Sequence, residues 1–381
     1  MTTQPSSRPV VQPVTTRRDW RDFLAFSGRL HRADPHWIAP LRHERRRQWS
    51  PRNPTFEHLE ACAFLARREG RVVGTISAQV DRLLPAGSEG RIGYFGQFDC
   101  IDDQTVADAL LGQARRWLAE RGCERVQGPF DLTINQQCGL LVEGFETPPM
   151  VMMGHSPPRY AAHLANNGLS RAMAMYAYQL APDFPAPPAM TRLLARSARR
   201  VRFRPMDFSR FGEEVELLRE LFNDAWQSNW GFVPLTPEEF RRTGNDLRQL
   251  IKPAYSCIAE VDGQPAGFII ALPNIHELIA DLNGRLLPFG WAKLLWRLKT
   301  RRATTARVPL MGVTQAFQRG PMGAVISFGM IDAVRHALHA DGIRNVELSW
   351  ILETNDGMNG LIEAMGGDRY KTYAIFEGPV A

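Results

Sequence analysis

The sequence predicts an α+β fold, built on a mixed α/β sheet, that is present twice in tandem. Residues 64–78 and 257–271 each show the pattern of a β-hairpin: a strand, a turn with an acidic residue and glycine, and a second strand. The glycines of the two hairpins are offset by 193 positions. An apolar helical face between Val106 and Leu118 returns between Ile326 and Leu338, offset by 220 positions. This repetition predicts two domains of one fold, each a mostly antiparallel central sheet flanked by helices.

The first copy is predicted to begin with a helical region from Arg17 to Arg47. Prolines at 35 and 40 interrupt this region, because a residue before proline avoids the helical conformation. The apolar face described above predicts a helix at 103–121. Besides the hairpin, the other predicted elements are a strand at 92–98, a strand at 124–128, a short helix at 158–166 and a strand at 172–180.

The second copy repeats this order. Its periodicity predicts a strand near Val201 and a helix at 213–226 before the second hairpin. After the hairpin, the predicted elements are a strand at 308–313, a helix at 323–340, a strand at 345–350, a helix at 358–365 and a strand at 372–377.

Proline density over residues 183–188 marks a linker between the copies. The change of offset from 193 to 220 locates an insertion in the second copy, between its third and fourth strands. The predicted organisation is a flexible N-terminal tail at 1–16, a first domain at 17–182, a linker at 183–200 and a second domain at 201–381 with an insertion at 273–307.

The composition is that of a globular protein in water, with 44% hydrophobic and 23% charged residues among 381. The formal charge of +6 is a small excess and does not by itself indicate nucleic acid. The five cysteines form no C-x-x-C pair and no metal-ligand spacing, so we expect reduced thiols and no metal. Because no signal peptide and no apolar run of about 18 residues is found, we expect a cytoplasmic protein, with peripheral contact to the inner face of the cytoplasmic membrane as an alternative.

A glycine-containing turn precedes the long helix of the second copy. It consists of residues 318–324, Gln-Arg-Gly-Pro-Met-Gly-Ala. Main-chain N–H groups at a helix N-terminus, the helix dipole and Arg319 together suit a pyrophosphate. The same turn also serves as an ordinary helix cap, which is the alternative interpretation.

The first copy has acidic residues at the corresponding place. Asp102 and Asp103 stand 220 positions before Met322 and Gly323. Two carboxylates repel a phosphate, so we interpret them as structural N-caps. A phosphorylated cofactor is therefore expected in the second copy alone.

At this point the order of elements and the loop resemble the GNAT superfamily of N-acyltransferases. The resemblance covers residues 201–381, and residues 57–180 resemble a second, diverged GNAT-like domain. It implies that acyl-CoA is the co-substrate and that its pyrophosphate lies on the loop, with Asn355 near the thioester. The implied CoA-binding residues are Gln318, Arg319, Gly320, Gly323, Ala324 and Asn355. The chain departs from the pattern at Pro321, where glycine is usual, and at Ile362, where a tyrosine usually acts as the general acid.

Five further segments resemble a bacterial tandem-GNAT family whose members include ceramide synthases. They are Asp34-Pro-His-Trp-Ile, Asn53-Pro-Thr-Phe-Glu-His58, the region 128–149 beginning Gly-Pro-Phe-Asp, Trp230-Gly-Phe-Val-Pro-Leu-Thr236 and Glu347-Leu-Ser-Trp-Ile-Leu-Glu-Thr-Asn355. The resemblance implies transfer of a long-chain acyl group from acyl-CoA to the amine of a sphingoid base, giving a ceramide-type product.

The insertion supports a lipid substrate on physical grounds. Trp291, Leu294, Leu295 and Leu298 fall on one helical face. Between Leu282 and Arg307 the sequence holds seven basic residues and no acidic one. A cationic amphipathic helix suits an anionic membrane surface or the mouth of an acyl groove, although an ordinary packed helix with a basic outer face shows the same pattern. Nucleic acid is not expected, because no helix-turn-helix or base-stacking sheet is evident.

Amide formation needs a base for the amine and a proton donor for the leaving thiolate. Glu347, on the fifth strand of the second copy, is the predicted base; Tyr373 is the predicted acid and His58 a further catalytic candidate. Glu353, and the pair His276 and Glu277, are weaker alternatives. No Ser/His/Asp or Cys/His spacing indicates a covalent intermediate, so direct transfer is expected. The residues expected to bind substrate are Trp230, Phe232, His276, Trp291 and Trp350.

Two other functions fit the same sequence. One is an acyltransferase of this fold that acts on a small polar amine or an amino acid. The other is a non-catalytic acyl-CoA or lipid sensor, which Pro321 and the missing tyrosine favour.

Overall fold

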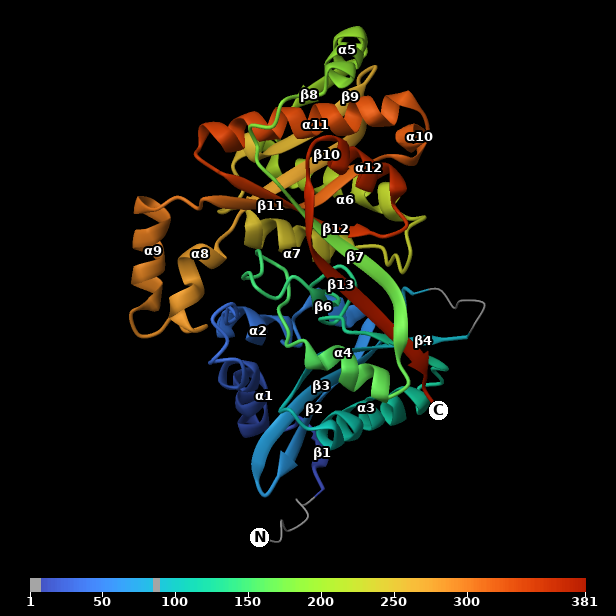
Figure 1. Cartoon of the computed structure of the whole chain (residues 1–381), viewed down its shortest axis with the longest axis vertical. Coiled ribbons are helices and arrows are strands. Elements are labelled where there is room, and N and C mark those ends of the chain that lie inside the picture. Colours follow the sequence, from blue (N-terminus) through green and yellow to red (C-terminus); the bar gives the residue numbers. More distant parts are fainter. Residues whose placement is uncertain (1–7, 85–89) are drawn as a thin grey trace. The chain divides into compact units, whose positions relative to one another are not determined.

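The computed structural model describes residues 8–84 and 90–381, and these form two compact units (Figure 1). The first unit takes the described residues up to Ala174 together with Ile279–Lys293 and Lys371–Ala381. The second unit takes Met175–Leu278 and Leu294–Tyr370. Two strands, β7 (Ser170–Leu180) and β13 (Asp368–Pro379), pass from one unit into the other.

The first unit is a sheet with the strand order β1-β2-β3-β4-β5-β13, and β6 also pairs with β13. Its strand pairs are antiparallel except for the parallel pair β4–β5. The strands are β1 (Val10–Pro13), β2 (Leu59–Arg68), β3 (Arg71–Asp81), β4 (Ile92–Cys100), β5 (Arg125–Gly128) and β6 (Leu140–Glu143). The helices are α1 (Arg17–Leu30), α2 (Arg42–Gln48), the 3-10 helix η1 (Pro54–Glu57), α3 (Gln104–Ala119) and α4 (Arg159–Asn166).

Alternation along β2 separates the two faces of this sheet. Phe64 belongs to the apolar cluster that includes Val106, Leu110 and other residues of α3, whereas Leu65 belongs to a cluster with Phe23 of α1. Neighbouring residues of a strand point to opposite faces, so α3 and α1 cover opposite faces of the sheet. The helical face found at Val106–Leu118 in the sequence is therefore the core face of α3.

The second unit repeats this plan with the strand order β7-β12-β11-β10-β9-β8, in which only β11–β12 is parallel. The strands are β8 (Val201–Arg204), β9 (Ser256–Val261), β10 (Gln264–Pro273), β11 (Thr305–Val313) and β12 (Asn345–Leu352). The longer helices are α5 (Pro188–Ser197), α6 (Phe211–Trp226), α7 (Pro237–Leu247), α11 (Pro321–Ala340) and α12 (Asp356–Ala364). The short ones are η2 (Phe208–Arg210), η3 (Pro253–Tyr255) and α10 (Gln315–Gln318).

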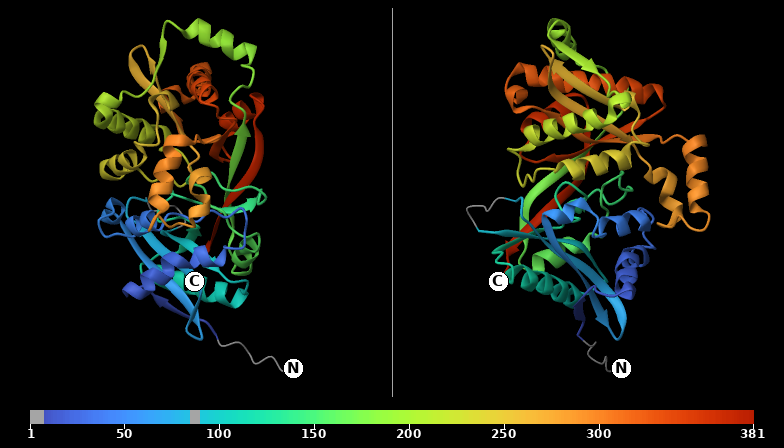
Figure 2. Two further views of the ribbon diagram at one scale, coloured as in Figure 1. Left: turned by 90° about the vertical axis from the view of Figure 1, so that its left-hand side faces the viewer. Right: turned by 180° about the vertical axis from the view of Figure 1, so that it is seen from behind.

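Helices also cover both faces of the second sheet, with α11 on one side and α6 and α7 on the other (Figure 2). A side chain at Gly267 of β10 would meet Ile326 and Met330 of α11. The adjacent Phe268 instead packs its ring against Trp226 of α6, with centroids 6.1 Å apart. The alternation seen in the first unit therefore holds in the second, as the duplication predicts.

The insertion between β10 and β11 forms α8 (His276–Ile279), η4 (Ala280–Leu282) and α9 (Gly290–Thr300). In the described part of the chain, no helix is long and apolar enough to cross a membrane. The same residues contain no group of three His, Cys, Asp or Glu side chains placed to hold a metal ion.

The structure departs from the expected boundaries at both ends of the first domain. Val10–Pro13, which we expected to lie in a flexible tail, pair with Phe64–Arg67 of β2 as strand β1, while residues 1–7 lie outside the described part. In the expected linker, residues 188–197 form helix α5.

The final strands are exchanged relative to the expected domains. The strand expected to finish the first domain, β7, pairs through Met175–Leu180 with β12 in the second unit. The strand expected to finish the second domain, β13, pairs through Phe376–Pro379 with β5 in the first unit. Periodicity predicts that a segment is a strand but carries no information on its partner, because every strand offers the same main-chain groups.

Candidate active site

The two parallel strands at the centre of the second unit separate part of the way along. Residues 305–308 of β11 pair with residues 345–348 of β12. Beyond this point, β11 continues only along β10, and β12 resumes pairing with β7 at Ile351 after a register shift. In the described residues no pairing joins the later parts of β11 and β12, so Val308 and Leu348 mark the apex at which the strands diverge.

A buried polar cluster lies at this apex. Arg307 and Glu347 are directly paired across the two strands, and both are buried. The Ser349 hydroxyl donates to Oε1 of Glu347 over 2.5 Å, and the phenolic hydroxyl of Tyr370, near the start of strand β13, donates to Oε2. Each oxygen of the carboxylate therefore has its own hydroxyl donor.

Arg307 compensates the charge of this carboxylate. Its Nε lies 3.5 Å from Oε1 of Glu347 and donates to Oγ of Ser349 over 2.7 Å, while one Nη donates to the main-chain oxygen of Ser349 over 3.1 Å. An isolated carboxylate is very costly to bury, and a guanidinium held by several hydrogen bonds offsets that cost. Glu347, an expected catalytic residue, thus lies in a prepared polar site.

The predicted pyrophosphate loop leads into α11. Gly320 is the N-cap, with a φ of +99°, and Pro321 is the first helical residue. Proline is favourable there, because that N–H has no helical partner in any case. It therefore removes one of the N–H groups that a loop with glycine at this position would offer. A side chain at Gly323 would lie 2.5 Å from the main-chain oxygen of Phe317, so only glycine allows the loop to fold this closely onto the first turn.

The other predicted CoA-binding residues have different surroundings. Gln318 donates through Nε2 to the main-chain oxygens of Ala225 and Val313, which fixes the loop rather than leaving the amide for a ligand. Arg319 is exposed, and Ala324 is half-buried in the first turn of α11. Asn355 caps α12 by accepting from the N–H of Met358.

The corresponding helix of the first unit is capped by its own carboxylate. Asp103 accepts from the N–H of Thr105 and from Arg68. Although partial burial favours the neutral form, the hydrogen bonds from Thr105 and Arg68 lower the pKa of Asp103 below its ordinary value. Asp102, which we also expected to be a cap, is largely exposed and does not cap the helix.

The strand divergence of the first unit is closed as well. After β4 and β5 pair through residues 92–94 and 125–127, the N–H of Phe130 donates to the oxygen of Phe95 over 2.8 Å. Gln79 donates to the oxygen of Phe130, and a side chain at Gly96 would lie 1.7 Å from that same oxygen. In the first unit, the turn at Phe130 thus occupies the position that corresponds to the gap between β11 and β12 in the second unit.

The three expected catalytic residues do not share a site. Tyr373 lies in the first unit, fully buried, where its hydroxyl donates to the main-chain oxygen of Gly154. His58 also lies in the first unit and is buried, with Nδ1 2.8 Å from Asp81. Glu347 alone is at the apex of the second unit.

The expected substrate-binding residues are dispersed. Trp350 follows Ser349 on β12 and is half-buried. Trp230 and Phe232 are half-buried in the segment after α6, with the Phe232 ring 6.3 Å from that of Phe222. His276 begins α8, and its main-chain N–H donates to Oδ1 of Asn274. Trp291 is exposed on α9.

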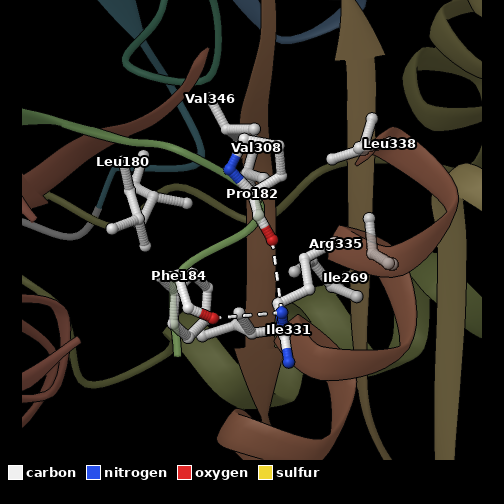
Figure 3. Close-up of a pocket in the computed structure, with 11 residues that line it drawn as sticks. Leu180, Pro182, Phe184, Ile269, Val308, Ile331, Arg335, Leu338 and Val346 are labelled. Atoms are coloured by element: carbon white, nitrogen blue, oxygen red, sulfur yellow. Dashed lines mark hydrogen bonds between the residues drawn. The ribbon is translucent and has the colours of Figure 1, made fainter. Parts of the chain in front are cut away.

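A small apolar pocket lies on the α11 side of the second sheet (Figure 3). Val308 and Leu348, the last paired residues before the divergence, contribute to its lining. Arg335 of α11 borders it and donates to the main-chain oxygens of Pro182 and Phe184 over 3.3 and 3.2 Å. Val308 and Leu348 therefore line this pocket, whereas Glu347, which precedes Leu348 on β12, points to the opposite face of the sheet.

Arg307, Ser349 and Tyr370 were not among the residues we expected at the site. Ser349 is two positions from Glu347, and this spacing places both side chains on one face of a strand. That signal was available in the sequence. The partnership with Arg307 and Tyr370 joins residues 40 and 23 positions away, and only the packing of β11 and β13 reveals it.

Comparison with solved structures identifies the fold of this chain. The tandem GNAT protein of the clavulanic acid biosynthesis pathway matches with a TM-score of 0.56 at 15% identity, over 98% of this chain and 99% of its own. A GCN5-related N-acetyltransferase from Sphaerobacter thermophilus matches with a TM-score of 0.55 at 14% identity, over 99% and 97%. The chain therefore has the tandem-GNAT fold.

The relatives in sequence are far more similar. The bacterial ceramide synthase of Caulobacter vibrioides is 44% identical over 370 residues, which is 96% of each chain. Protein YghO of Escherichia coli is 44% identical over 378 residues, 99% of this chain and 97% of its own. No family model matches the chain. The chain belongs to the family of the bacterial ceramide synthase, and the resemblance noted in its sequence is confirmed.

Proposed function

We propose that this N-acyltransferase transfers a long-chain acyl group from acyl-CoA to the amine of a sphingoid base. The observation that carries the proposal is the buried Glu347 at the apex of β11 and β12, in a member of the ceramide synthase family. A carboxylate in this position is suited to take a proton from an attacking amine.

The second unit is proposed to hold the CoA. Its pyrophosphate would lie against the first turn of α11, beside Arg319 and Gly323, and the pantetheine arm would pass between the diverging strands. Two features of the first unit support this assignment: Asp103 occupies its helix N-terminus, and the turn at Phe130 occupies its strand divergence.

Direct attack of the amine on the thioester is the proposed route. The pKa of the Cys100 thiol and that of the Cys257 thiol are each raised to about 12, and burial is the main cause in both. Thiols held in this way are poor nucleophiles, because the thiolate is the reactive form. They therefore do not favour an acyl-enzyme intermediate.

The apolar pocket that Val308 and Leu348 help to line supports a long acyl chain. Its lining is almost entirely aliphatic or aromatic, and burial of each methylene of a chain is worth about 0.8 kcal/mol. An acetyl group would gain little from such a pocket, whereas a fatty acyl chain would be held by it.

Peripheral contact with the cytoplasmic membrane is part of the same proposal. Exposed apolar side chains cluster at the insertion: Leu287, Phe289, Trp291, Leu295, Trp296 and Leu298. Basic residues surround them, and no acidic residue lies between 283 and 306. Exposed aromatic and cationic side chains on one short segment suit an anionic lipid surface, which is also where a lipid product is delivered.

The test is a transfer assay with purified protein, acyl-CoAs of graded chain length and a sphingoid base. We expect free CoA and an N-acylated base, both increasing with acyl length up to long chains, as measured by a thiol reagent and by mass spectrometry. Strict preference for acetyl-CoA or for a small polar amine would refute the lipid substrate. Acyl-CoA binding without release of CoA, with every amine offered, would identify a sensor instead.

A further inference from the structure

From the cluster around Glu347 we infer that Tyr370 is the catalytic residue that exchanges protons with the substrates, and that Glu347 acts through it. The inference rests on the proposed acyl transfer and specifies its proton path. Glu347 has no exposed surface, whereas Tyr370 is half-buried. Tyr370 is therefore the member of this hydrogen-bonded pair that has exposed surface.

The contacts assign one role to each oxygen of the carboxylate. Oε1 is held by the Ser349 hydroxyl at 2.5 Å and lies 3.5 Å from Nε of Arg307. Oε2 accepts from Tyr370. Ser349 and Arg307 are thus positioning residues, because they fix the carboxylate in the orientation that leaves Oε2 to the tyrosine. A carboxylate that accepts from a phenol is ready to receive its proton.

The reaction balances with this single relay. The neutral amine forms the N–C bond with the thioester carbonyl carbon, and its proton passes to the phenolic oxygen as Tyr370 gives its own proton to Oε2 of Glu347. The C–S bond then breaks, the CoA sulfur takes a proton from Tyr370, and Glu347 returns its proton to the phenolic oxygen. One proton has moved from nitrogen to sulfur, and the cluster is restored without any further reactant.

This relay also accounts for a departure in the sequence. Ile362 stands on α12 where the resemblance to the GNAT superfamily implies a tyrosine acid, so the relay takes its proton donor from another element. Tyr370 follows α12 closely in the chain and lies in β13. It supplies a phenol to the apex from a strand instead of a helix.

The matched test compares Tyr370→Phe with Tyr373→Phe, two identical changes three residues apart on β13. Tyr370→Phe is expected to lower kcat by about 10²–10⁴-fold, as loss of a general acid–base does, with an unchanged KM for acyl-CoA. Tyr373→Phe is expected to keep kcat, since its hydroxyl is bound to Gly154 in the first unit. The melting temperature of each variant reports whether it folds.

A double variant separates the relay from a structural role. Because Glu347 and Tyr370 act as one unit, Glu347→Gln combined with Tyr370→Phe is expected to be no slower than the slower single variant. For the positioning role, Ser349→Ala is expected to lower kcat at constant KM, and Ser349→Thr, which keeps the hydroxyl, to restore it.

Two results would overturn the relay. One is a wild-type kcat in Tyr370→Phe, and the other is a loss of kcat in the double variant equal to the product of the two single losses. These outcomes are distinct from failure of the substrate assignment. If the wild-type protein releases CoA with a different amine, the same variants are compared on that amine. A wild-type protein that acylates no amine would refute both the transferase and the relay.

Discussion

Asp341 follows the last turn of α11 and holds η3 to the end of that helix. Its carboxylate accepts from Lys252 over 2.5 Å and from the Tyr255 hydroxyl over 2.7 Å. The hydrogen bond from Lys252, and next the one from Tyr255, lower the pKa of Asp341 below its ordinary value. The ionised carboxylate therefore contributes to the stability of the folded second unit.

We predict that Asp341→Asn lowers the melting temperature at neutral pH and that this difference disappears in acid. With a lower pKa in the folded state than in the unfolded state, where it is about 3.9, the carboxylate stabilises the fold above about pH 4 and loses that effect as pH falls through the folded pKa. Thermal melts of both proteins from pH 7 to pH 2.5 measure the difference. A gap in melting temperature that stays constant over this range would contradict the assignment.

Arg319 is the residue on which the placement of CoA depends most directly. It is exposed beside the N-terminus of α11, and a charge-assisted hydrogen bond to a phosphate is worth about 1.5–3 kcal/mol. We predict that Arg319→Ala weakens acyl-CoA binding by about tenfold or more, as measured by calorimetry. Arg199, an exposed arginine just beyond α5, is the control and should be replaceable by alanine without effect. Unchanged affinity in Arg319→Ala would place the cofactor elsewhere.

Among residues, Glu347 and Gly323 were open to prediction because their signals are local. A carboxylate in an apolar strand and a glycine at the start of a helix are each unusual in their own segment. Arg307 and Tyr370 were missed for the opposite reason, since an arginine in β11 and a tyrosine in β13 have many ordinary explanations. Their role comes from which strands are neighbours.

At the scale of single elements, α9 and the segment before it are exceptional for their exposed apolar side chains. Leu287 and Phe289 are each 78% exposed, and Trp291 is 52% exposed. Arg297, by contrast, is buried and donates to the main-chain oxygen of Leu278. The basic residues of this segment are therefore not all exposed to solvent. In the apolar stripe predicted from the sequence, Trp291, Leu295 and Leu298 are exposed.

We predict that Phe289→Asp weakens binding to vesicles of anionic phospholipid without lowering the melting temperature. An exposed aromatic side chain gains by entering the interface, while a carboxylate is repelled by the lipid charge. Vesicle sedimentation with anionic and with neutral lipid measures the effect. Leu83→Ser, at an exposed leucine outside the insertion, is the control and should bind as the wild type does. Equal binding by wild type and Phe289→Asp would contradict a membrane role for this segment.

The hairpins and helices α3, α6 and α11 were predicted with small errors at their ends, whereas α5, α7 and β1 were not predicted. The helix expected at 323–340 is α11 (Pro321–Ala340), and the one expected at 103–121 is α3 (Gln104–Ala119). Both have a strong apolar face over many turns. The four residues of β1 are too few for a pattern, and they form a strand because β2 offers them a partner.

At the scale of the whole molecule, the C-terminal segment belongs to the core of the first unit. Ala374, Phe376 and Val380 are buried in the apolar cluster that α3 closes. Lys371 is also buried, and its Nζ donates to the main-chain oxygens of Gly144 and Thr147. The chain thus returns to its first unit after completing most of the second.

Deletion of residues 371–381 is predicted to destabilise the first unit selectively. The deletion removes the strand that pairs with β5 and buried side chains that include Phe376 and Val380, each worth about 1.5–3 kcal/mol if fully buried. None of the deleted residues belongs to the apolar core of the second unit. Hydrogen exchange should show lost protection in β4 and β5, with β9 and β10 retained. Loss of protection confined to β9–β11 would contradict the exchange of strands.

The sequence by itself determined the duplicated α+β plan, the approximate ends of α3, α6 and α11, the acidic cap of the first copy and the family. These features arise from local periodicity, from local turn chemistry and from segments that lie together in the chain. Only the tertiary structure decided that β7 and β13 change units, that the turn at Phe130 closes the first divergence, and that Tyr370 rather than Tyr373 reaches Glu347. The physical reason is common to all three: main-chain groups and polar side chains accept any partner of suitable geometry, and packing of distant segments selects which partner is present.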